Sequence, residues 1–200
     1  MIGIVDYGMG NLRSVEKAFQ YIGHDAKIID DAKEIKDAAA LVLPGVGAFP
    51  DAMEILNKRG ISNAIKEEVE KGKMLLGICL GMQLLFDRSF EVRETEGLHI
   101  LKGEISEIKT NLKVPHIGWN SLIIKKDNQL LNGVRDGDSV YFVHSYYLSN
   151  GDLDDICATV DYGISIPAVV CKDNVFSCQF HPEKSGNIGL KILRNFAEMI

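Results

Sequence analysis

The chain has 200 residues, a length that suits one domain with a substantial core. Its formal net charge of -6 argues against a general nucleic-acid binder, which needs a basic surface. No apolar stretch is long enough to span a membrane, and the start, MIGIVDYGMGN, is not typical of a signal peptide. The four cysteines lack metal-type spacing, so we expect reduced thiols in a cytoplasmic protein, with no metal and no cofactor.

The first half of the chain predicts alternating strands and helices. Short apolar runs predict buried strands, and apolar residues at helical spacing predict the helices between them. The predicted strands are 2–5, 26–29, 39–43 and 74–78, and the predicted helices are 12–22, 50–71 with a break near Gly60, and 80–86. A glycine-rich turn at 6–11 precedes the first helix, with Asn11 as its N-cap. This alternation predicts a parallel sheet with helices on both faces.

The second half predicts mostly strands, followed by one amphipathic helix at 187–199. The predicted strands are 103–108, 119–124, 140–143, 156–160, 168–171 and 175–180. The sequence contains no internal repeat and no low-complexity linker. We therefore expect residues 1–200 to form a single α/β domain. Its mixed, mostly parallel sheet is flanked by helices and has extra strands in the second half.

The stretch GICLG at residues 77–81 places Cys79 between two glycines, after a predicted strand and before a predicted helix. This is the layout of a nucleophile elbow, a tight turn at which bulky neighbours would clash. The turn also places the sulfur at a helix N-terminus, where the dipole favours the thiolate. The amide of Leu80 points toward where an oxyanion would form. The alternative is a buried structural cysteine, which is common in protein cores.

A cysteine nucleophile needs a general base, and the chain has five histidines. His181 directly follows the predicted strand 175–180, so it faces the same sheet edge as Cys79. Glu183 lies two residues further on, where its carboxylate would hold the imidazole in one tautomer and stabilise its charged form. The alternative is a loop that happens to contain HPE. Of the other histidines, His24 and His99 are interpreted as structural or exposed. The roles of His116 and His144 stay open.

The stretch LPGVG at residues 43–47 ends another predicted strand at the same sheet edge. Its two glycines allow the backbone to approach a ligand closely or to change its dihedral angles. That freedom suits a second oxyanion donor, and a plain strand-ending turn is the alternative.

Together, PGVG, GICLGMQ and HPEKS resemble the class-I, triad-type glutamine amidotransferases. The resemblance implies a flavodoxin-like α/β fold and a catalytic triad of Cys79, His181 and Glu183 that hydrolyses the side-chain amide of glutamine. It also implies an oxyanion hole built from the backbone of Val46, Gly47 and Leu80. The glutamine contacts that it implies are Gly47, Gln83, His144, Ser145 and Tyr146. For Gln83, an exposed helix residue without a role is the alternative.

Further segments resemble the glutaminase subunits of imidazole glycerol phosphate synthases over essentially the whole chain: DYGMGNLRSV, LPGVGAF, VPHIGWN, YFVHSYY and FHPEKSG. This resemblance implies a heterodimer with a (β/α)₈-barrel cyclase subunit. The cyclase uses the ammonia to make imidazole glycerol phosphate and an aminoimidazole-carboxamide ribotide in histidine biosynthesis. In the family, the PGVG peptide is thought to turn and complete the oxyanion hole. The candidates for the partner face are Asn11, Trp119 and Tyr141, although Trp119 is equally open to interpretation as a core residue.

Three other functions stay open. The chain could be a glutaminase subunit that feeds a different synthase, such as a sugar-amidinating enzyme, with an identical triad. It could be a self-contained cysteine hydrolase, which would turn over glutamine without a partner. It could also be a non-catalytic amidotransferase-like binding module, which would have no reason to keep all three triad residues.

Overall fold

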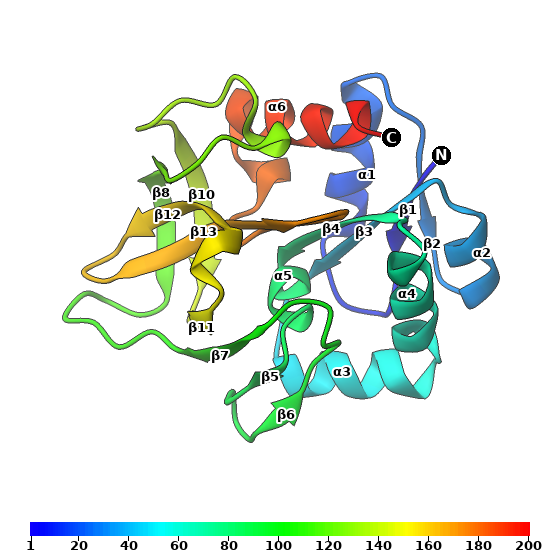
Figure 1. Cartoon of the computed structure of the whole chain (residues 1–200), viewed down its shortest axis with the longest axis horizontal. Helices are drawn as coiled ribbons and strands as arrows, with labels where there is room; N and C mark the ends of the chain where they lie inside the picture. Colours follow the sequence, from blue (N-terminus) through cyan, green and yellow to red (C-terminus); the bar gives the residue numbers. More distant parts are fainter.

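The computed structural model describes all residues from Met1 to Ile200. Its centre is an eight-stranded sheet (Figure 1). The strand order is β2 (Ala26–Ile29), β1 (Ile2–Val5), β3 (Ala40–Gly45), β4 (Met74–Cys79), β14 (Val175–Cys178), β13 (Ser165–Lys172), β12 (Ile156–Asp161) and β9 (Ile123–Ile124). The first five strands in this order, from β2 to β14, run parallel to one another. Each of the next three strands, β13, β12 and β9, pairs antiparallel with the strand before it. The carboxyl ends of the parallel strands therefore meet at one edge, where ligands bind in open α/β sheets.

The helices agree with the sequence expectations except in one place. The predicted helices appear as α1 (Leu12–Tyr21), α3 (Phe49–Lys58), α4 (Ile61–Glu70), α5 (Leu80–Leu84) and α6 (Gly186–Glu198). The expected break falls at Gly60, which has a φ of +70° and separates α3 from α4. This left-handed conformation is one that glycine adopts readily, so the break is local in origin.

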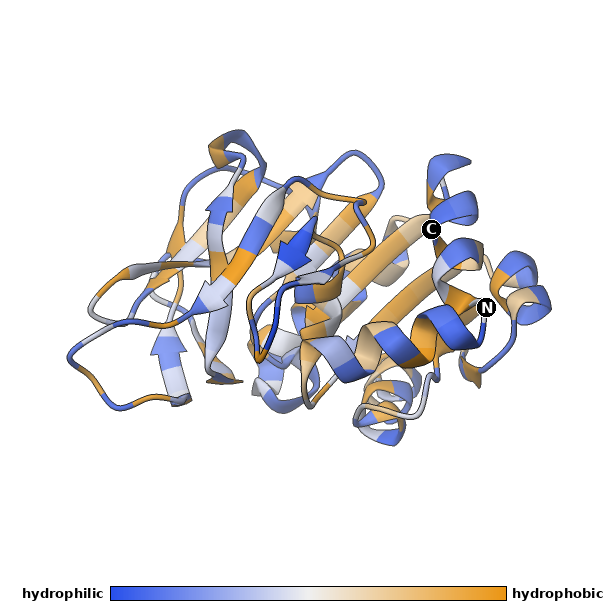
Figure 2. Cartoon of the chain, turned by 90° about the horizontal axis from the view of Figure 1, so that it is seen from below, coloured by the Kyte–Doolittle hydropathy of each residue, from blue (hydrophilic) through white to orange (hydrophobic).

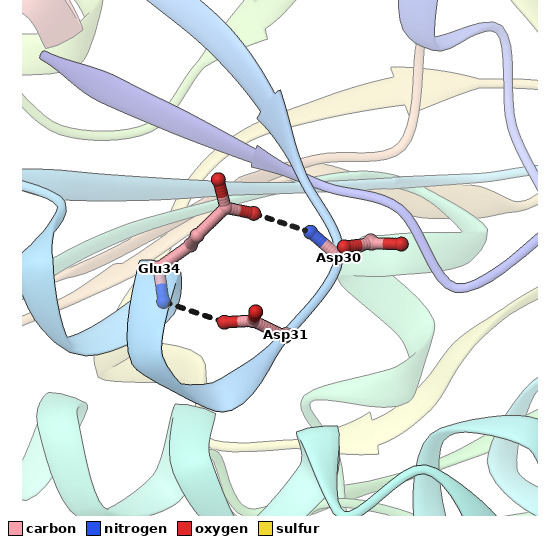
Figure 3. A group of neighbouring side chains, drawn as sticks. All are labelled: Asp30, Asp31 and Glu34. Atoms are coloured by element: carbon pink, nitrogen blue, oxygen red, sulfur yellow. Dashed lines mark hydrogen bonds between the residues drawn. The ribbon is translucent and has the colours of Figure 1, made fainter.

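The sequence analysis missed the helix α2 (Ala32–Asp37), although its start carries a capping signal. Asp31 accepts a hydrogen bond from the backbone N–H of Glu34 at 2.8 Å, and the Glu34 carboxylate accepts from the N–H of Asp30 at 3.2 Å (Figure 3). Lys27 pairs with Glu34 at 2.8 Å. The side chains of this Asp-x-x-Glu pattern accept hydrogen bonds from backbone N–H groups that have no partner within the helix at its start. This helix start accounts for the cluster of three carboxylates, of which Asp30 and Asp31 are exposed and Glu34 is half-buried.

Two apolar cores lie on the two faces of the central sheet. Because side chains alternate along a strand, Ile4 faces one core and Val5 faces the other. Helices α1 and α6 cover the first face, and α3, α4 and α5 cover the second (Figure 1). Apolar residues are concentrated in the central strands, and polar residues lie on the outer sides of the helices (Figure 2). No helix combines the length and the apolar character that crossing a membrane requires.

The strands of the second half do not all join the central sheet. One pair is β8 (His116–Ser121) with β10 (Ser139–His144). A separate four-stranded sheet contains β11 (Tyr146–Gly151), β7 (Gly103–Glu107), β5 (Arg88–Ser89) and β6 (Thr95–Glu96). The sequence analysis did not predict β5, β6 or β11. The predicted strand 119–124 is divided, with one part in β8 and the other in β9.

Candidate active site

Cys79 lies at a strained turn between β4 and α5. Its φ is +54°, a value that non-glycine residues rarely adopt and that concentrates at functional sites. A Cβ at Gly81 would lie 1.7 Å from the carbonyl oxygen of Leu43, and a Cβ at Gly77 would lie 2.9 Å from the Cα of Met82. The turn therefore has no room for a side chain on either side of the cysteine. Because α5 has only five residues, the contribution of its dipole at the sulfur is limited.

His181 and Glu183 form a buried pair at the same sheet edge. The expected strand 175–180 ends earlier, at Cys178, so His181 does not follow the strand directly but precedes a short 3₁₀ turn, η3 (Pro182–Lys184). Its Nδ1 lies 2.8 Å from Oε1 of Glu183, and the two side chains are 3% and 1% exposed. Burial opposes the charged imidazole, but the neighbouring Cys79 and the hydrogen-bonded carboxylate of Glu183 outweigh it and raise the pKa of His181 to about 9.

The cysteine and the histidine line one cavity of about 320 Å³. The Nε2 atom of His181 is buried and has no hydrogen-bond partner, so it is available to a group in this cavity. The thiol of Cys79 donates to the carbonyl oxygen of Val143 at 3.8 Å. The geometry brings together a thiol, an imidazole with one free nitrogen, and a carboxylate that holds the other nitrogen.

The segment 44–47 forms part of the wall of the same cavity. Gly45 is the register partner of Cys79 across β3 and β4. Val46 and Gly47 line the cavity together with Leu80. Gly47 has a φ of +103°, and a Cβ there would lie 2.4 Å from the methyl group of Met9. The positive φ therefore favours glycine at this position, whereas the methyl group at the end of the flexible Met9 side chain could move aside.

The remaining residues expected to contact glutamine also reach the cavity. Gln83, His144, Ser145 and Tyr146 all line it. Gln83 is 4% exposed, so its interpretation as an exposed helix residue is wrong. Its Nε2 donates to the carbonyl oxygen of Tyr146 at 2.9 Å and to Oε1 of Gln179 at 3.0 Å. Both amide hydrogens are therefore committed within the protein, and Oε1 is the atom left to face a ligand.

Two residues of the site escaped the sequence analysis. Glu91 comes from the segment 87–96, in which no motif was recognised, yet it is the one carboxylate among the cavity-lining side chains. It accepts from the backbone N–H of Phe49 at 2.8 Å, and burial raises its pKa above the usual range. Gln179 is fully buried, with Nε2 3.9 Å from the Cys79 sulfur. The only sequence signal for Gln179 is a polar residue within the predicted strand 175–180, two positions before His181, and Glu91 has no such signal.

The residues expected at a partner face lie on different elements. Trp119 on β8 is 58% exposed, so its interpretation as a core residue is wrong. Tyr141 is its register partner on β10, and the two rings meet edge to face with centroids 6.0 Å apart. Asn11 occupies the N-cap position of α1, but its side chain makes no capping hydrogen bond and accepts instead from the hydroxyl of Ser14 at 2.9 Å.

The other histidines separate into surface and buried groups. His99 lies outside any strand, is 44% exposed, and faces Asp87 at 3.1 Å. His24 is half-buried and lies beyond the end of α1. His116 is buried, with its ring stacked on those of Phe142 and Tyr162. None of these three lines the cavity at Cys79.

Comparison with known proteins agrees with this arrangement. The family model for class-I glutamine amidotransferases matches residues 3–200. The chain belongs to this family. Within it, the chain groups with proteins named imidazole glycerol phosphate synthase subunit HisH. It is 64% identical to the one from Caldanaerobacter subterraneus subsp. tengcongensis, over 100% of this chain and 98% of the relative. Identity is 52% to a relative from Bacillus cereus (100% of this chain, 95% of the relative) and 50% to one from Lactococcus lactis (100% and 98%).

Solved structures agree on the amidotransferase fold. A crystal structure described as a glutamine amidotransferase superposes with a TM-score of 0.79 at 20% identity, covering 99% of this chain and 97% of the other. The structure of PurLQS from Thermotoga maritima superposes with a TM-score of 0.77 at 19% identity, covering 99% of this chain and 97% of the other. At these identities the match concerns the fold alone. The expected class-I amidotransferase fold, a mixed sheet with flanking helices, is confirmed.

Proposed function

We propose that this amidotransferase hydrolyses glutamine to glutamate and ammonia at Cys79, with His181 and Glu183 completing a catalytic triad. The ammonia passes to a cyclase subunit in histidine biosynthesis. The observation that carries the proposal is the strained cysteine beside the buried His181–Glu183 pair, all at one cavity. The names of the similar HisH proteins support the pathway.

The first chemical step uses the thiolate and the imidazolium together. With its pKa raised to about 9, His181 carries its proton at neutral pH. The Cys79 sulfur attacks the carboxamide carbon of glutamine, and His181 Nε2 gives its proton to the departing nitrogen, which leaves as ammonia. Neutral His181 then takes a proton from water, which cleaves the glutamyl thioester and releases glutamate. Glu183 holds Nδ1 and keeps Nε2 directed at the reacting atoms.

Each tetrahedral intermediate carries an oxyanion that needs donors. The N–H of Leu80, the residue after the nucleophile, is one donor in this proposal, and the backbone at Val46 and Gly47 supplies the other. Removing one such donor typically costs about 10²–10³ in rate. Gly45 is the last paired residue of β3, and Val46 and Gly47 follow it outside the strand, where the glycine allows the backbone to change its dihedral angles. This freedom supports gating of the site by a partner.

The cavity also offers groups for the amino-acid end of glutamine. Its α-ammonium needs an anion, and Glu91 is the one carboxylate on the wall. Gln83 Oε1 and the backbone of residues 144–146 supply further polar contacts. Among these, the Gln83 side chain is fixed before a ligand arrives, because both of its N–H groups are already bonded.

The partner in this proposal is a (β/α)₈-barrel cyclase subunit, which forms a heterodimer with the chain. It converts the ammonia and its ribotide substrate to imidazole glycerol phosphate and an aminoimidazole-carboxamide ribotide. Direct transfer matters because ammonia released into water becomes ammonium. The exposed Trp119, with the half-buried Tyr141 against its ring, supports a docking face here, since aromatic anchors are favoured in interface centres. Asn11 is the third residue proposed for this face.

Glutamate release from glutamine tests the proposal. The assay is run on the chain alone and then with the cyclase subunit and its ribotide. We expect low activity alone, a large rise with the liganded partner, and none in Cys79→Ala. The matched control is Cys157→Ala, which removes a buried cysteine from β12 and leaves the cavity unchanged.

Other outcomes would point elsewhere. Full activity without a partner would contradict gating and favour a self-contained hydrolase. Activation only by another synthase would replace the pathway and keep the triad. A folded chain that is inactive with every partner would support a non-catalytic module.

A further inference from the structure

A continuous chain of buried hydrogen bonds ends at the sulfur of Cys79. Its last member is Gln179, whose Oε1 accepts from Gln83 at 3.0 Å and whose Nε2 lies 3.9 Å from the sulfur. Gln83 is held in turn by the carbonyl oxygen of Tyr146 at 2.9 Å. Gln179 is completely buried and does not line the cavity, so it is placed to act on the cysteine rather than on a ligand.

The same carbonyl of Tyr146 anchors a pair of histidines. His144 Nδ1 lies 2.8 Å from this oxygen, and His144 Nε2 lies 3.0 Å from Nδ1 of His116. At its far end, His116 Nε2 lies 3.4 Å from Nδ2 of Asn120, which also donates to the carbonyl oxygen of Asp161 at 2.9 Å. The series of hydrogen bonds thus extends from β8 through β10 to the sulfur of Cys79.

The donors and acceptors along this series of hydrogen bonds determine which nitrogen atoms carry hydrogen. His144 Nδ1 faces a carbonyl oxygen, so it carries the hydrogen. The Asn120 NH₂ group, which donates to Asp161, also faces His116 Nε2, so this nitrogen accepts and His116 donates from Nδ1 to His144 Nε2. Both rings are therefore neutral, in agreement with burial lowering the pKa of each to about 4. Gln83 likewise has to present its NH₂ group to the Tyr146 oxygen. A reversed Gln179 amide would set NH₂ against NH₂, so its donor side is directed at the sulfur.

We propose that Gln179 is a positioning residue for Cys79: its amide, locked in the donor orientation, holds the sulfur and stabilises the thiolate. This rests on the proposed role of Cys79 as the nucleophile. A hydrogen bond to a charged group is worth more than one to a neutral group, so the contact strengthens when the thiol ionises. The titratable groups around the sulfur are Tyr7 just beyond β1, Glu91 and His144 at the cavity wall, Cys178 of β14, and His181 with Glu183.

Two variants of similar size test this role. Gln179→Glu still accepts from Gln83 but turns a negative oxygen toward the sulfur, and Gln179→Met removes the donor without adding charge. The matched control is Ser177→Ala, on β14 two residues before Gln179, which deletes a buried hydrogen bond from the Ser177 hydroxyl to the carbonyl oxygen of Val170. Circular dichroism and thermal melting identify the variants that fold, and either Gln179 variant suffices if the other does not.

The first readout is the rate at which iodoacetamide alkylates Cys79, followed by mass spectrometry of its peptide from pH 5 to 10. We expect the midpoint of this profile to move to higher pH by about one unit in the Gln179 variants, and to stay in place in Ser177→Ala. The second readout is glutaminase activity with the partner. We expect kcat to fall about 10- to 100-fold, with little change in KM.

Unchanged alkylation midpoints in folded Gln179 variants would overturn the proposal, as would a rise in KM alone. Alkylation needs no glutamine turnover, so it separates this inference from the proposed function. A shifted midpoint in a chain that never hydrolyses glutamine would uphold the positioning role and reject the glutaminase.

Discussion

Gly45 and Cys79 are register partners at the carboxyl ends of the parallel strands β3 and β4. This pairing places the segment that follows Gly45 beside the turn that carries the sulfur. It also leaves no room for a side chain, because a Cβ at Gly45 would lie 2.3 Å from the hydroxyl of Tyr7. Pairing in the sheet therefore holds the start of the segment proposed as an oxyanion donor beside Cys79, and only Val46 and Gly47 lie beyond the paired residues.

The tightness of this turn predicts the effect of Gly81→Ala. Its Cβ would collide with the backbone oxygen of Leu43, which cannot move without breaking the sheet. We expect a loss of about 3 kcal/mol or more in unfolding free energy, measured by urea titration, together with loss of activity. The control is Gly72→Ala, where φ is +93° but no atom lies within 4 Å. That change should cost only about 1 kcal/mol, and equal costs would contradict the steric argument.

The raised pKa of His181 predicts an alkaline limit to activity. His181 holds its proton below about pH 9 and loses it above, so the acid proposed to protonate the leaving nitrogen is lost at higher pH. We expect kcat to fall as the pH rises through about 9. In Glu183→Gln the negative charge that supports the imidazolium is lost, so the falling limb of the pH profile of kcat should move to lower pH. A limb that stays in place in this variant would show that Glu183 does not support the charged imidazole.

The neutral histidine pair predicts acid sensitivity of the fold. The pKa of His116 and of His144 is lowered to about 4 by burial, while unfolded histidine titrates near 6.5. The unfolded chain therefore binds more protons between these values, and stability falls as the pH drops from about 6.5 to about 4. The difference in unfolding free energy between pH 7 and pH 5, measured by urea titration, should be smaller in His116→Phe than in the wild type. His24→Gln, which removes a histidine outside the pair, should keep the wild-type difference.

The place of Glu91 predicts a defect in binding. Glu91→Gln keeps an acceptor for the N–H of Phe49 but removes the charge proposed to meet the α-ammonium of glutamine. We expect KM for glutamine to rise about tenfold or more, with kcat changed much less, in steady-state assays with the partner. Asp51→Asn removes a nearby exposed charge from α3 and is the control. A fall in kcat at constant KM would place Glu91 in the chemical step instead.

The exposure of Trp119 predicts its contribution to docking. Trp119→Ala should weaken binding of the cyclase subunit about tenfold or more, since central aromatic residues dominate interface energies. Unstimulated glutaminase activity should not change, because Trp119 does not line the cavity. Tyr21→Ala, which removes an aromatic side chain that is 80% exposed on α1, is the matched control. Titration calorimetry measures both affinities, and equal affinities would place the docking face elsewhere.

Several features were readable from the sequence because consecutive residues determine them. Apolar runs predicted the strands β1 and β2 at their observed bounds, and Gly60 predicted the break between α3 and α4. The elbow at Cys79 was visible for the same reason: a strand, a tight turn and a helix start are all local, and two glycines mark the turn. HPE placed the imidazole and its carboxylate within three residues.

Other features depended on contacts between distant parts of the chain, which only the tertiary structure decided. The two-residue strands β5 and β6 have little local signal, and they join a sheet only because β5 also pairs with β7, which in turn pairs with the distant β11. Glu91 reaches the cavity because the segment around β5 and β6 folds back over α3. Gln179 and Gln83 are 96 residues apart and meet only when β14 lies beside β4. Sequence patterns thus pointed to the candidate reactive groups, and long-range packing determined which polar atoms hold and surround them.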